Sequence, residues 1–238
     1  MQGERQIGSK VDGWQVPPVP PGDLVLDGTH ARLEPMTAAD HAAVLYPAYQ
    51  GQDWVWDYLP YGPFTSSPAY FRWMQGMQGR ADPLFLAIKD KDSGQWGGVA
   101  SYLRITPESG SIEVGHINLA PRLQRTRAAT EAMFLMMQWA FEAGYRRYEW
   151  KCDALNRPSR SAAQRFGFSY EGVFRQATVV KGRNRDTAWF AVIDKDWPAL
   201  KEAYAAWLNP ANFDAQGRQF ERLADVTKLV RVADDPSL

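Results

Sequence analysis

Apolar positions in the first half of the chain fall into short runs separated by turn residues. Runs of this length, some of them alternating between polar and apolar residues, are typical of β-strands when turn signals bound them. Turn signals at residues 92–94 and 108–110 separate the last three runs, which predicts an antiparallel meander that ends at Pro121. The four predicted strands are 30–34, 84–88, 96–105 and 111–119.

Helical periodicity is clearest over residues 127–143, where apolar residues recur at helical spacing and Gly144 supplies a stop. Side chains that can cap a helix precede several other candidates. The remaining helices are predicted to begin at Thr37, at Ser66 or Ser67, at Asn156, near Trp197 and near Phe220. Three further strands are predicted at 148–152, 168–178 and 187–193.

This order of elements predicts an α/β fold. The strand–helix–strand unit from residue 115 to residue 152 should place its two strands in parallel, joined by a right-handed crossover. Strands joined by short turns favour antiparallel pairing. We therefore expect a mixed, mostly antiparallel central sheet of about six to seven strands flanked by helices, with a C-terminal helical extension.

The chain is predicted to form one domain with an addition at each end. Residues 1–23 are polar and rich in proline, which is typical of an extended arm. Residues 24–197 hold the strands and the main helices, and residues 198–238 are expected to form a helical extension packed on the core. The tryptophans of this extension could also pack on a partner subunit in a homodimer.

Composition narrows the class of protein. The chain has 27 Lys and Arg against 27 Asp and Glu, and this neutral balance argues against nucleic acid as a partner. The single cysteine, Cys152, excludes an intrachain disulfide and a cysteine-rich metal site, and it fits a reducing compartment. No apolar run approaches the roughly 20 residues of a membrane span, and no secretory signal opens the chain. These features predict a cytoplasmic protein with no metal and no membrane partner.

The segment between the strand 111–119 and the helix 127–143 has the character of an anion site. It lies at the carboxyl end of a parallel strand and leads into a helix N-terminus, whose free N–H groups and dipole suit a pyrophosphate. Arg122, Arg125 and Arg127 add three cations. A solvated, arginine-rich helix start fits the same residues, and the pattern alone leaves both interpretations open.

Several motifs resemble those of one family, in the order in which that family places them. The run 124–132, which ends in Thr130-Glu131-Ala132, is similar to the acyl-CoA loop of the GNAT acetyltransferase superfamily, in its RimJ/RimL-like branch. The resemblance covers about residues 24–197, which is most of the chain. The other matching segments are 26–35, 112–116, 156–163, 165–168 and 171–175.

The resemblance implies an acyl-CoA-dependent N-acyltransferase, with acetyl-CoA as the expected co-substrate. In this superfamily the acceptor amine attacks the thioester directly, without an acyl-enzyme. The acceptor is expected to be a primary amine of a small molecule or a protein N-terminus. Carried onto this chain, the coenzyme-binding residues are Ile117, Asn118, Ala120, Gln124, Arg125, Thr126, Arg127, Ala128, Ala129, Thr130, Asn156 and Ser159.

The loop departs from the family pattern at two positions. Its usual glycines are replaced by Arg125 and Arg127. Glycine permits a tight turn and a close approach of the backbone to phosphate, whereas an arginine side chain either compensates as a cation or obstructs the site. The alternative interpretation is therefore a GNAT-fold binding protein with impaired CoA binding.

Three residues are candidates for catalysis. The resemblance gives Glu113 the position of the base, acting directly or through a water; otherwise it is a solvent-facing or salt-bridged glutamate. His116 could titrate near neutrality, and strand alternation predicts that it lies on the opposite face from Glu113. Ala163 replaces the family's usual tyrosine acid, so Ser159 is the expected acid unless it only caps the helix.

The aromatic segment 54–61 lies where this fold builds its acceptor pocket. The expected substrate-binding residues are Trp54, Trp56, Tyr58 and Glu113. Asp53 or Asp57 would attract a cationic amine, and aromatic rings would cover it. A hydrophobic plug under a loop explains the same aromatics. The basic segment 181–186 is predicted to be an exposed hairpin tip.

Overall fold

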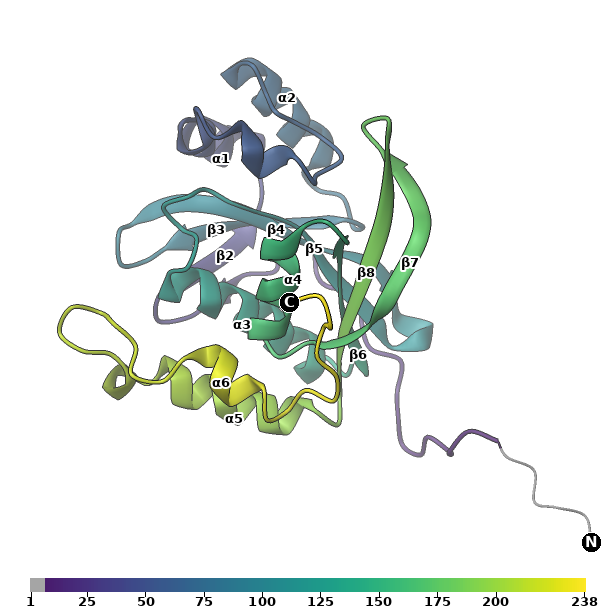
Figure 1. Cartoon of the computed structure of the whole chain (residues 1–238). Coiled ribbons are helices and arrows are strands. Elements are labelled where there is room, and N and C mark those ends of the chain that lie inside the picture. Colours follow the sequence, from purple (N-terminus) through teal and green to yellow (C-terminus); the bar gives the residue numbers. More distant parts are fainter. Residues whose placement is uncertain (1–6) are drawn as a thin grey trace, which may run out of the picture.

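The strands of the protein assemble into one eight-stranded sheet, which the computed structural model describes within residues 7–238 (Figure 1). From edge to edge the strands are β1 (Leu26–Asp27), β2 (Ala31–Pro35), β3 (Leu84–Asp90), β4 (Gln95–Thr106), β5 (Ser111–Leu119), β6 (Arg147–Asp153), β8 (Arg183–Ile193) and β7 (Ser169–Val180). Neighbouring strands are antiparallel except β5 and β6, which are parallel. The predicted α/β class is confirmed. The strand beyond the seven expected is β1, whose two residues are too short to show a pattern.

The helices begin at the caps that the sequence predicts. The side chains of Thr37, Ser66 and Asn156 accept hydrogen bonds from the backbone N–H three residues further on. The tail helix expected near 220–229 is shorter in the structure, where it covers only five residues. The helices are α1 (Ala38–Leu45), α2 (Ser67–Met77), α3 (Arg127–Glu142), α4 (Arg157–Arg165), α5 (Trp197–Leu208) and α6 (Leu223–Thr227).

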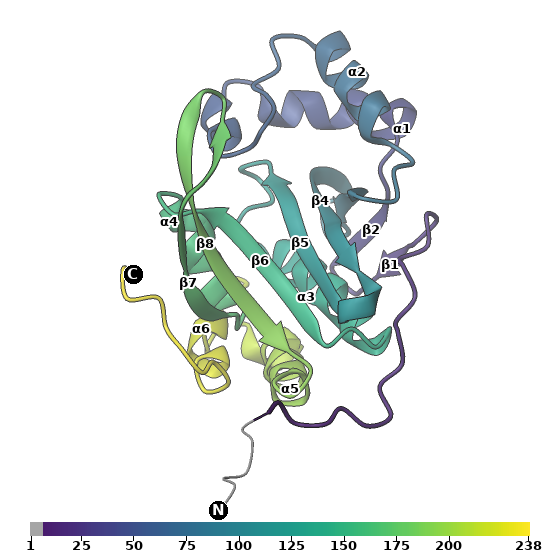
Figure 2. The same ribbon diagram turned by 90° about the vertical axis from the view of Figure 1, so that its right-hand side faces the viewer.

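Two apolar clusters lie on opposite faces of the sheet. Leu86 of β3 belongs to the larger cluster, which contains residues of α3 and α5, and its neighbour Ala87 belongs to the cluster under α1 and α2. Adjacent strand residues point to opposite faces, so these helix pairs cover opposite sides. Figure 2 shows α3 behind the sheet and α1 and α2 at its upper end. In this view, much of the sheet face below α1 and α2 carries no helix.

Strands β5 and β6 separate halfway along their length. Their ladder ends at the pair Val114–Trp150, although β5 continues to Leu119 and β6 to Asp153. Beyond that pair, no strand within the described residues 7–238 pairs with β5 on the β6 side. The sequence could not show this opening, because strand pairing is a non-local property.

A buried carboxylate ties the edge of the sheet to α3. Glu131 accepts hydrogen bonds from the backbone N–H groups of Thr29, His30 and Ala31 at 3.0, 2.6 and 2.6 Å. A Cβ at Gly28 would lie 2.5 Å from the same carboxylate, so a larger residue there would displace Glu131 from its position. The glutamate of the Thr-Glu-Ala motif is therefore structural and does not face a ligand.

The C-terminal extension packs on its own chain. Leu200 and Tyr204 of α5 are fully buried in the larger cluster. Beyond α6, Asp235 forms a bidentate ion pair with Arg160 of α4, with both N–O distances at 2.6 Å. The Asp235 side chain is 0% exposed and the Arg160 side chain 9%. The last residues are thus fastened to α4 by a buried charge pair.

The N-terminal segment runs along the surface without a helix or strand over residues 7–23. Tyr145 donates a hydrogen bond from its hydroxyl to the carbonyl of Pro18 at 3.0 Å. Residues 1–6 of the expected arm lie outside the described residues, and the division of the chain at residues 23 and 197 stays a prediction. Among residues 7–238, every helix is too short or too polar to cross a membrane.

Candidate active site

The loop between β5 and α3 presents backbone N–H groups. Thr126 caps α3 by accepting the N–H of Ala129 at 3.0 Å. The N–H groups of Arg125, Arg127 and Ala128 donate to no acceptor among residues 7–238. Helix N-terminal amides left without partners favour negatively charged groups such as phosphate. The loop therefore offers the cradle that the sequence predicted for a diphosphate.

The three loop arginines are placed in different ways. Arg125 has φ of 61°, the left-handed region that favours glycine, so the backbone keeps a glycine-like turn with an exposed side chain. The guanidinium of Arg127 lies over the ring of Phe213, 4.7 Å from its centre. Arg122 donates to the carbonyl of Trp96. Phe213 comes from the C-terminal extension, and sequence patterns gave no sign that it would reach α3.

The opening between β5 and β6 continues from the cradle. Tyr49 donates its hydroxyl to the carbonyl of Asn118 at 2.9 Å. The Asn118 side chain is buried, and both of its polar atoms lack a hydrogen-bond partner among residues 7–238. Unpaired buried amides are costly, so this side chain is an exception among the buried polar groups of the described residues. Ile117 and Ala120 flank this segment, and their expected contact with the coenzyme stays a prediction.

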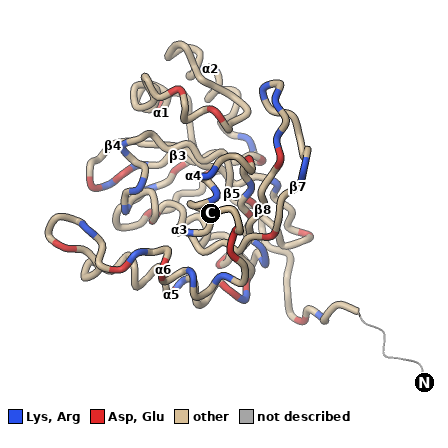
Figure 3. The backbone as a smooth tube through the Cα atoms, viewed as in Figure 1, with Lys and Arg blue, Asp and Glu red and all other residues tan. Residues whose placement is uncertain are grey.

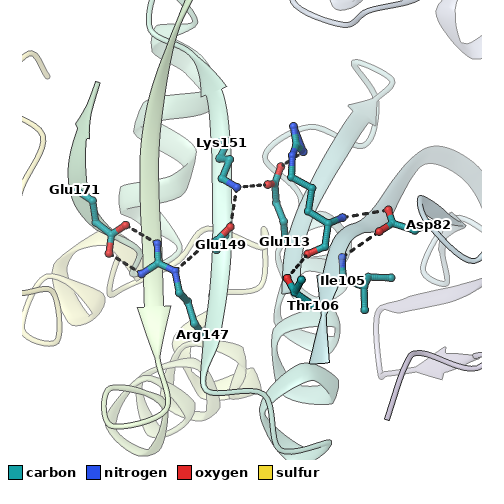
Figure 4. A network of polar contacts seen from close by, with 9 residues as sticks. Asp82, Ile105, Thr106, Glu113, Arg147, Glu149, Lys151 and Glu171 are labelled. Carbon is teal, nitrogen blue, oxygen red and sulfur yellow. Dashed lines mark hydrogen bonds and ion pairs between the residues drawn. The ribbon is translucent and has the colours of Figure 1, made fainter. Parts of the chain in front are cut away.

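Glu113 lies just before the point where the strands separate, in a network of charges (Figure 4). It is 2% exposed, so the solvent-facing alternative is wrong. Its carboxylate lies 3.0 Å from Arg104 Nη1 and 2.9 Å from Lys151 Nζ. Burial raises the pKa of Glu113 above its usual range, while the two cations oppose that rise. A salt-bridged glutamate is what the structure shows, and a carboxylate whose pKa is raised remains suited to accept a proton.

Sequence reasoning missed Lys151 and Arg104. A signal was present in β6, because charged Arg147, Glu149 and Lys151 alternate with Tyr148, Trp150 and Cys152. Such alternation predicts a polar face. It does not reveal which charges of the neighbouring strand lie opposite.

His116 occupies a different face from the one predicted. Gly115 pairs with Ser101 and Asn118 pairs with Val99, so β5 carries an extra residue in a bulge, and His116 has φ of 50°. The ring lies 5.1 Å from Phe85, on the face of Glu113. The bulge turns this side chain back, so the alternation argument was wrong.

His116 also does not titrate near neutrality. Its Nδ1 lies 3.2 Å from the hydroxyl of Tyr61, and the two rings stack. Burial, together with the nearby charges of Arg104 and Arg185, lowers the pKa of His116 to about 4. The imidazole is therefore neutral at pH 7 and is a weaker base than an ordinary histidine.

The first turn of α4 holds Asn156 and Ser159. Asn156 caps the helix by accepting the N–H of Ser159 at 3.1 Å. Ser159 Oγ accepts the indole N–H of Trp150 at 3.0 Å, and a hydroxyl that accepts one hydrogen bond can still donate its own proton. Burial raises the pKa of Cys152 to about 11, which agrees with its interpretation as a core residue. Ser159 is more than a cap, and its role as the acid stays a prediction.

The aromatic segment is both a plug and a pocket wall. Trp56 is 3% exposed and packs against Tyr49 and Phe64. It also lines a cavity of about 230 Å³ together with Asp53. Trp54 is 53% exposed and does not line this cavity.

The predicted hairpin tip lies beside the aromatic segment. Lys181, in the turn between β7 and β8, donates to the carbonyl of Trp56 at 2.8 Å. Tyr58 donates its hydroxyl to the carbonyl of Leu155 at 3.2 Å, next to α4. Basic positions recur along this hairpin (Figure 3). The hairpin, the aromatic segment and the start of α4 therefore border one region beside the opening.

Comparisons with known proteins agree on one class. Residues 30–169, more than half of the chain, match the model described as an acetyltransferase (GNAT) domain. A GCN5-related N-acetyltransferase from Brucella melitensis is 45% identical, with a TM-score of 0.88 over 92% of this chain and 100% of that one. A probable acetyltransferase of the GNAT family from Chromobacterium violaceum is 41% identical, with a TM-score of 0.76 over 84% and 100%. No curated protein matches the chain.

The β5–β6 pair and the loop before α3 are thus parts of an N-acetyltransferase. The chain is a member of the GNAT acetyltransferase family, whose enzymes use acetyl-CoA. Residues 7–238 contain no group of three His, Cys, Asp or Glu side chains that could hold a metal ion.

Arg127→Pro tests whether the cradle amides bind the coenzyme. Position 127 is the first residue of α3 and Thr126 is extended, with φ −89° and ψ 165°, so proline fits without breaking the helix. Arg127→Ala removes the same guanidinium but keeps the N–H. We expect the proline variant to bind acetyl-CoA about tenfold more weakly than the alanine variant, as calorimetric titration would measure, because one charge-assisted hydrogen bond is lost. Equal affinities would mean that this N–H is not used.

Proposed function

We propose that this enzyme transfers an acetyl group from acetyl-CoA directly to a primary amine. The observation that carries the proposal is the end of the β5–β6 ladder at Val114–Trp150, beside the unpaired amides of Arg125, Arg127 and Ala128. Together they form a track of main-chain groups that can hold a diphosphate and an extended arm. The bound coenzyme supplies a thioester carbonyl for attack.

The protein's own groups would then move protons around the reacting carbonyl. Glu113 would take the proton of the amine, directly or through one water, and its raised pKa brings it nearer to neutral pH. Main-chain N–H groups from His116 to Asn118 would polarise the carbonyl. Ser159 would give its proton to the departing thiolate, because its oxygen already accepts from Trp150. A carbon–nitrogen bond forms as the carbon–sulfur bond breaks.

The cavity beside Trp56 and Asp53 supports a small cationic amine as the acceptor. Its volume of about 230 Å³ suits a compact molecule. A carboxylate and aromatic faces together attract ammonium groups. A protein N-terminus is the second acceptor class, since its first residues could enter the same cavity.

Asp53→Asn is expected to raise KM for cationic amines about tenfold and to leave KM for acetyl-CoA unchanged. The assay is release of the coenzyme thiol with a panel of polyamines, aromatic amines and short peptides. Asp57→Asn is the matched control, because Asp57 is also exposed and does not line the cavity. Equal KM values in the two variants would place the acceptor elsewhere.

Other features stay proposals. The order of motifs supports the RimJ/RimL-like branch, and a single buried cysteine supports a cytoplasmic location. Trp197 and Trp207 are buried on the core of their own chain, so the tail gives no support to the homodimer. The alternative of impaired CoA binding rested on Arg125 and Arg127, and the contact of Arg127 with Phe213 argues against obstruction by that side chain. Undetectable binding of acetyl-CoA in a calorimeter would restore it.

A further inference from the structure

Lys151 occupies an unusual position for a lysine. It is the first residue of β6 after the last rung of the β5–β6 ladder, and its side chain is only 7% exposed. Its Nζ lies 2.9 Å from Glu113 and 2.7 Å from Glu149. The same atom lies 3.8 Å from the ring centre of Trp189. Lysine is rarely buried unless its charge is paired, so this ammonium is held in place by two carboxylates and an indole face.

The charges around Lys151 alternate in sign across the sheet (Figure 4). On one side, Glu149 also accepts from Arg147 at 2.6 Å, and Arg147 pairs with Glu171 of β7. On the other side, Arg104 of β4 binds the second oxygen of Glu113. Asp82 accepts two backbone N–H groups of β4, from Arg104 and Ile105.

The two cations beside Glu113 are not equivalent. Arg104 has a side chain that is 57% exposed, so solvent screens its charge. Lys151 is buried at the opening, where its field is screened least. Glu149 also pairs with Lys151, and its negative charge repels that of Glu113. The ammonium group therefore lies between two carboxylates.

We propose that Lys151 is a positioning residue for Glu113, which fixes the carboxylate at the opening and sets the pH at which acetyl transfer begins. This inference rests on the proposed function, in which Glu113 is the base. It goes beyond it by assigning the electrostatic control of the base to a residue that acts through its contact with Glu113.

The test compares the pH dependence of kcat/KM in the wild type and in Lys151→Met, with one acceptor throughout. Protonation of that acceptor contributes equally to both profiles. In the variant, the acid limb is expected to move up by about 1 pH unit or more, because Glu113 loses an opposite charge and Glu149 keeps only one of its two cations, Arg147. Lys151→Arg should return the acid limb most of the way to its wild-type position, because it keeps the positive charge. Lys201→Met is the control, since Lys201 makes a 2.9 Å pair with Glu142 on the exposed surface.

Glu149→Gln provides a second variant with the opposite sign. It removes a negative charge near Glu113 and leaves Lys151 with one carboxylate, so the limb should move down. Carbon-13 NMR of labelled glutamate carboxyls gives a readout that does not depend on turnover. The Glu113 signal is identified by its loss in Glu113→Gln.

The outcomes separate the two claims. Limbs and NMR midpoints that stay in place in Lys151→Met and Glu149→Gln would overturn the positioning role while leaving Glu113 as the base. A Glu113→Gln profile whose acid limb matches that of the wild type, after the shared contribution of the acceptor amine is subtracted, would instead overturn Glu113 as the base, whatever the NMR midpoint does. If Lys151→Met does not fold, the direction of the shift in Glu149→Gln decides the inference.

Discussion

Glu113→Gln is expected to lower kcat/KM for the acceptor amine by about 10²- to 10³-fold, and to leave the Kd of acetyl-CoA within about twofold. Glutamine keeps the shape and the contact with Arg104 but cannot take a proton. The amine would then have to lose its proton to bulk water. Steady-state thiol release and calorimetry measure the two quantities on the same preparation.

The pH dependence sharpens this prediction. A base works only when it is deprotonated, so the wild-type rate should rise with pH as Glu113 ionises. Because burial raises the pKa of Glu113, this limb should lie above the ordinary glutamate value of about 4.3. It should vanish in Glu113→Gln and persist in Glu142→Gln, whose carboxylate is 51% exposed. Wild-type turnover in the Glu113→Gln variant would remove Glu113 from the mechanism.

Asp235→Ala is expected to lower the free energy of unfolding by about 3–5 kcal/mol. Asp235 accepts two hydrogen bonds from Arg160, and its side chain is fully buried. Its removal leaves a buried guanidinium without a counter-ion. Urea denaturation followed by tryptophan fluorescence gives the difference, with Asp225→Ala as the control because Asp225 and its partner Arg222 are both exposed, at 59% and 71%.

The ion pair between Asp235 and Arg160 also predicts that acid weakens the attachment of the C-terminal tail. Hydrogen bonds from Arg160 and Ser237 outweigh the effect of burial and lower the pKa of Asp235. A carboxyl with a lowered folded-state pKa stabilises the protein fully above the unfolded value of about 3.9. The contribution is lost as pH falls through the folded-state pKa. The difference between wild type and Asp235→Ala should therefore shrink toward pH 2, and a constant difference would contradict the role of the ionised pair.

Local signals in the sequence predicted most of the helices and strands. Thr37, Ser66 and Asn156 cap helices because their side chains accept N–H groups only three residues away. Local order also indicated a candidate anion site, because the segment joins a strand end to a helix start, and coenzyme binding there stays a prediction. Arg125 keeps the turn of a glycine, which sequence alone could not decide.

Non-local contacts limited the prediction of the site. The bulge at His116 shifts the register of β5 against β4, and one residue of slip moves a side chain to the other face. Lys151 meets Glu113 only because β5 and β6 are neighbours in the sheet. Phe213 reaches Arg127 from 86 positions further along the chain, which no periodicity reports.

The tie between Glu131 and the turn at Gly28 has a consequence for how this protein can evolve. A side chain at position 28 would collide with the carboxylate at 2.5 Å, and a shorter acid at 131 would abandon three amides. Neither site can change alone without loss, so the two positions should covary among its relatives. A substitution at one of them becomes tolerable only after a compensating exchange at the other.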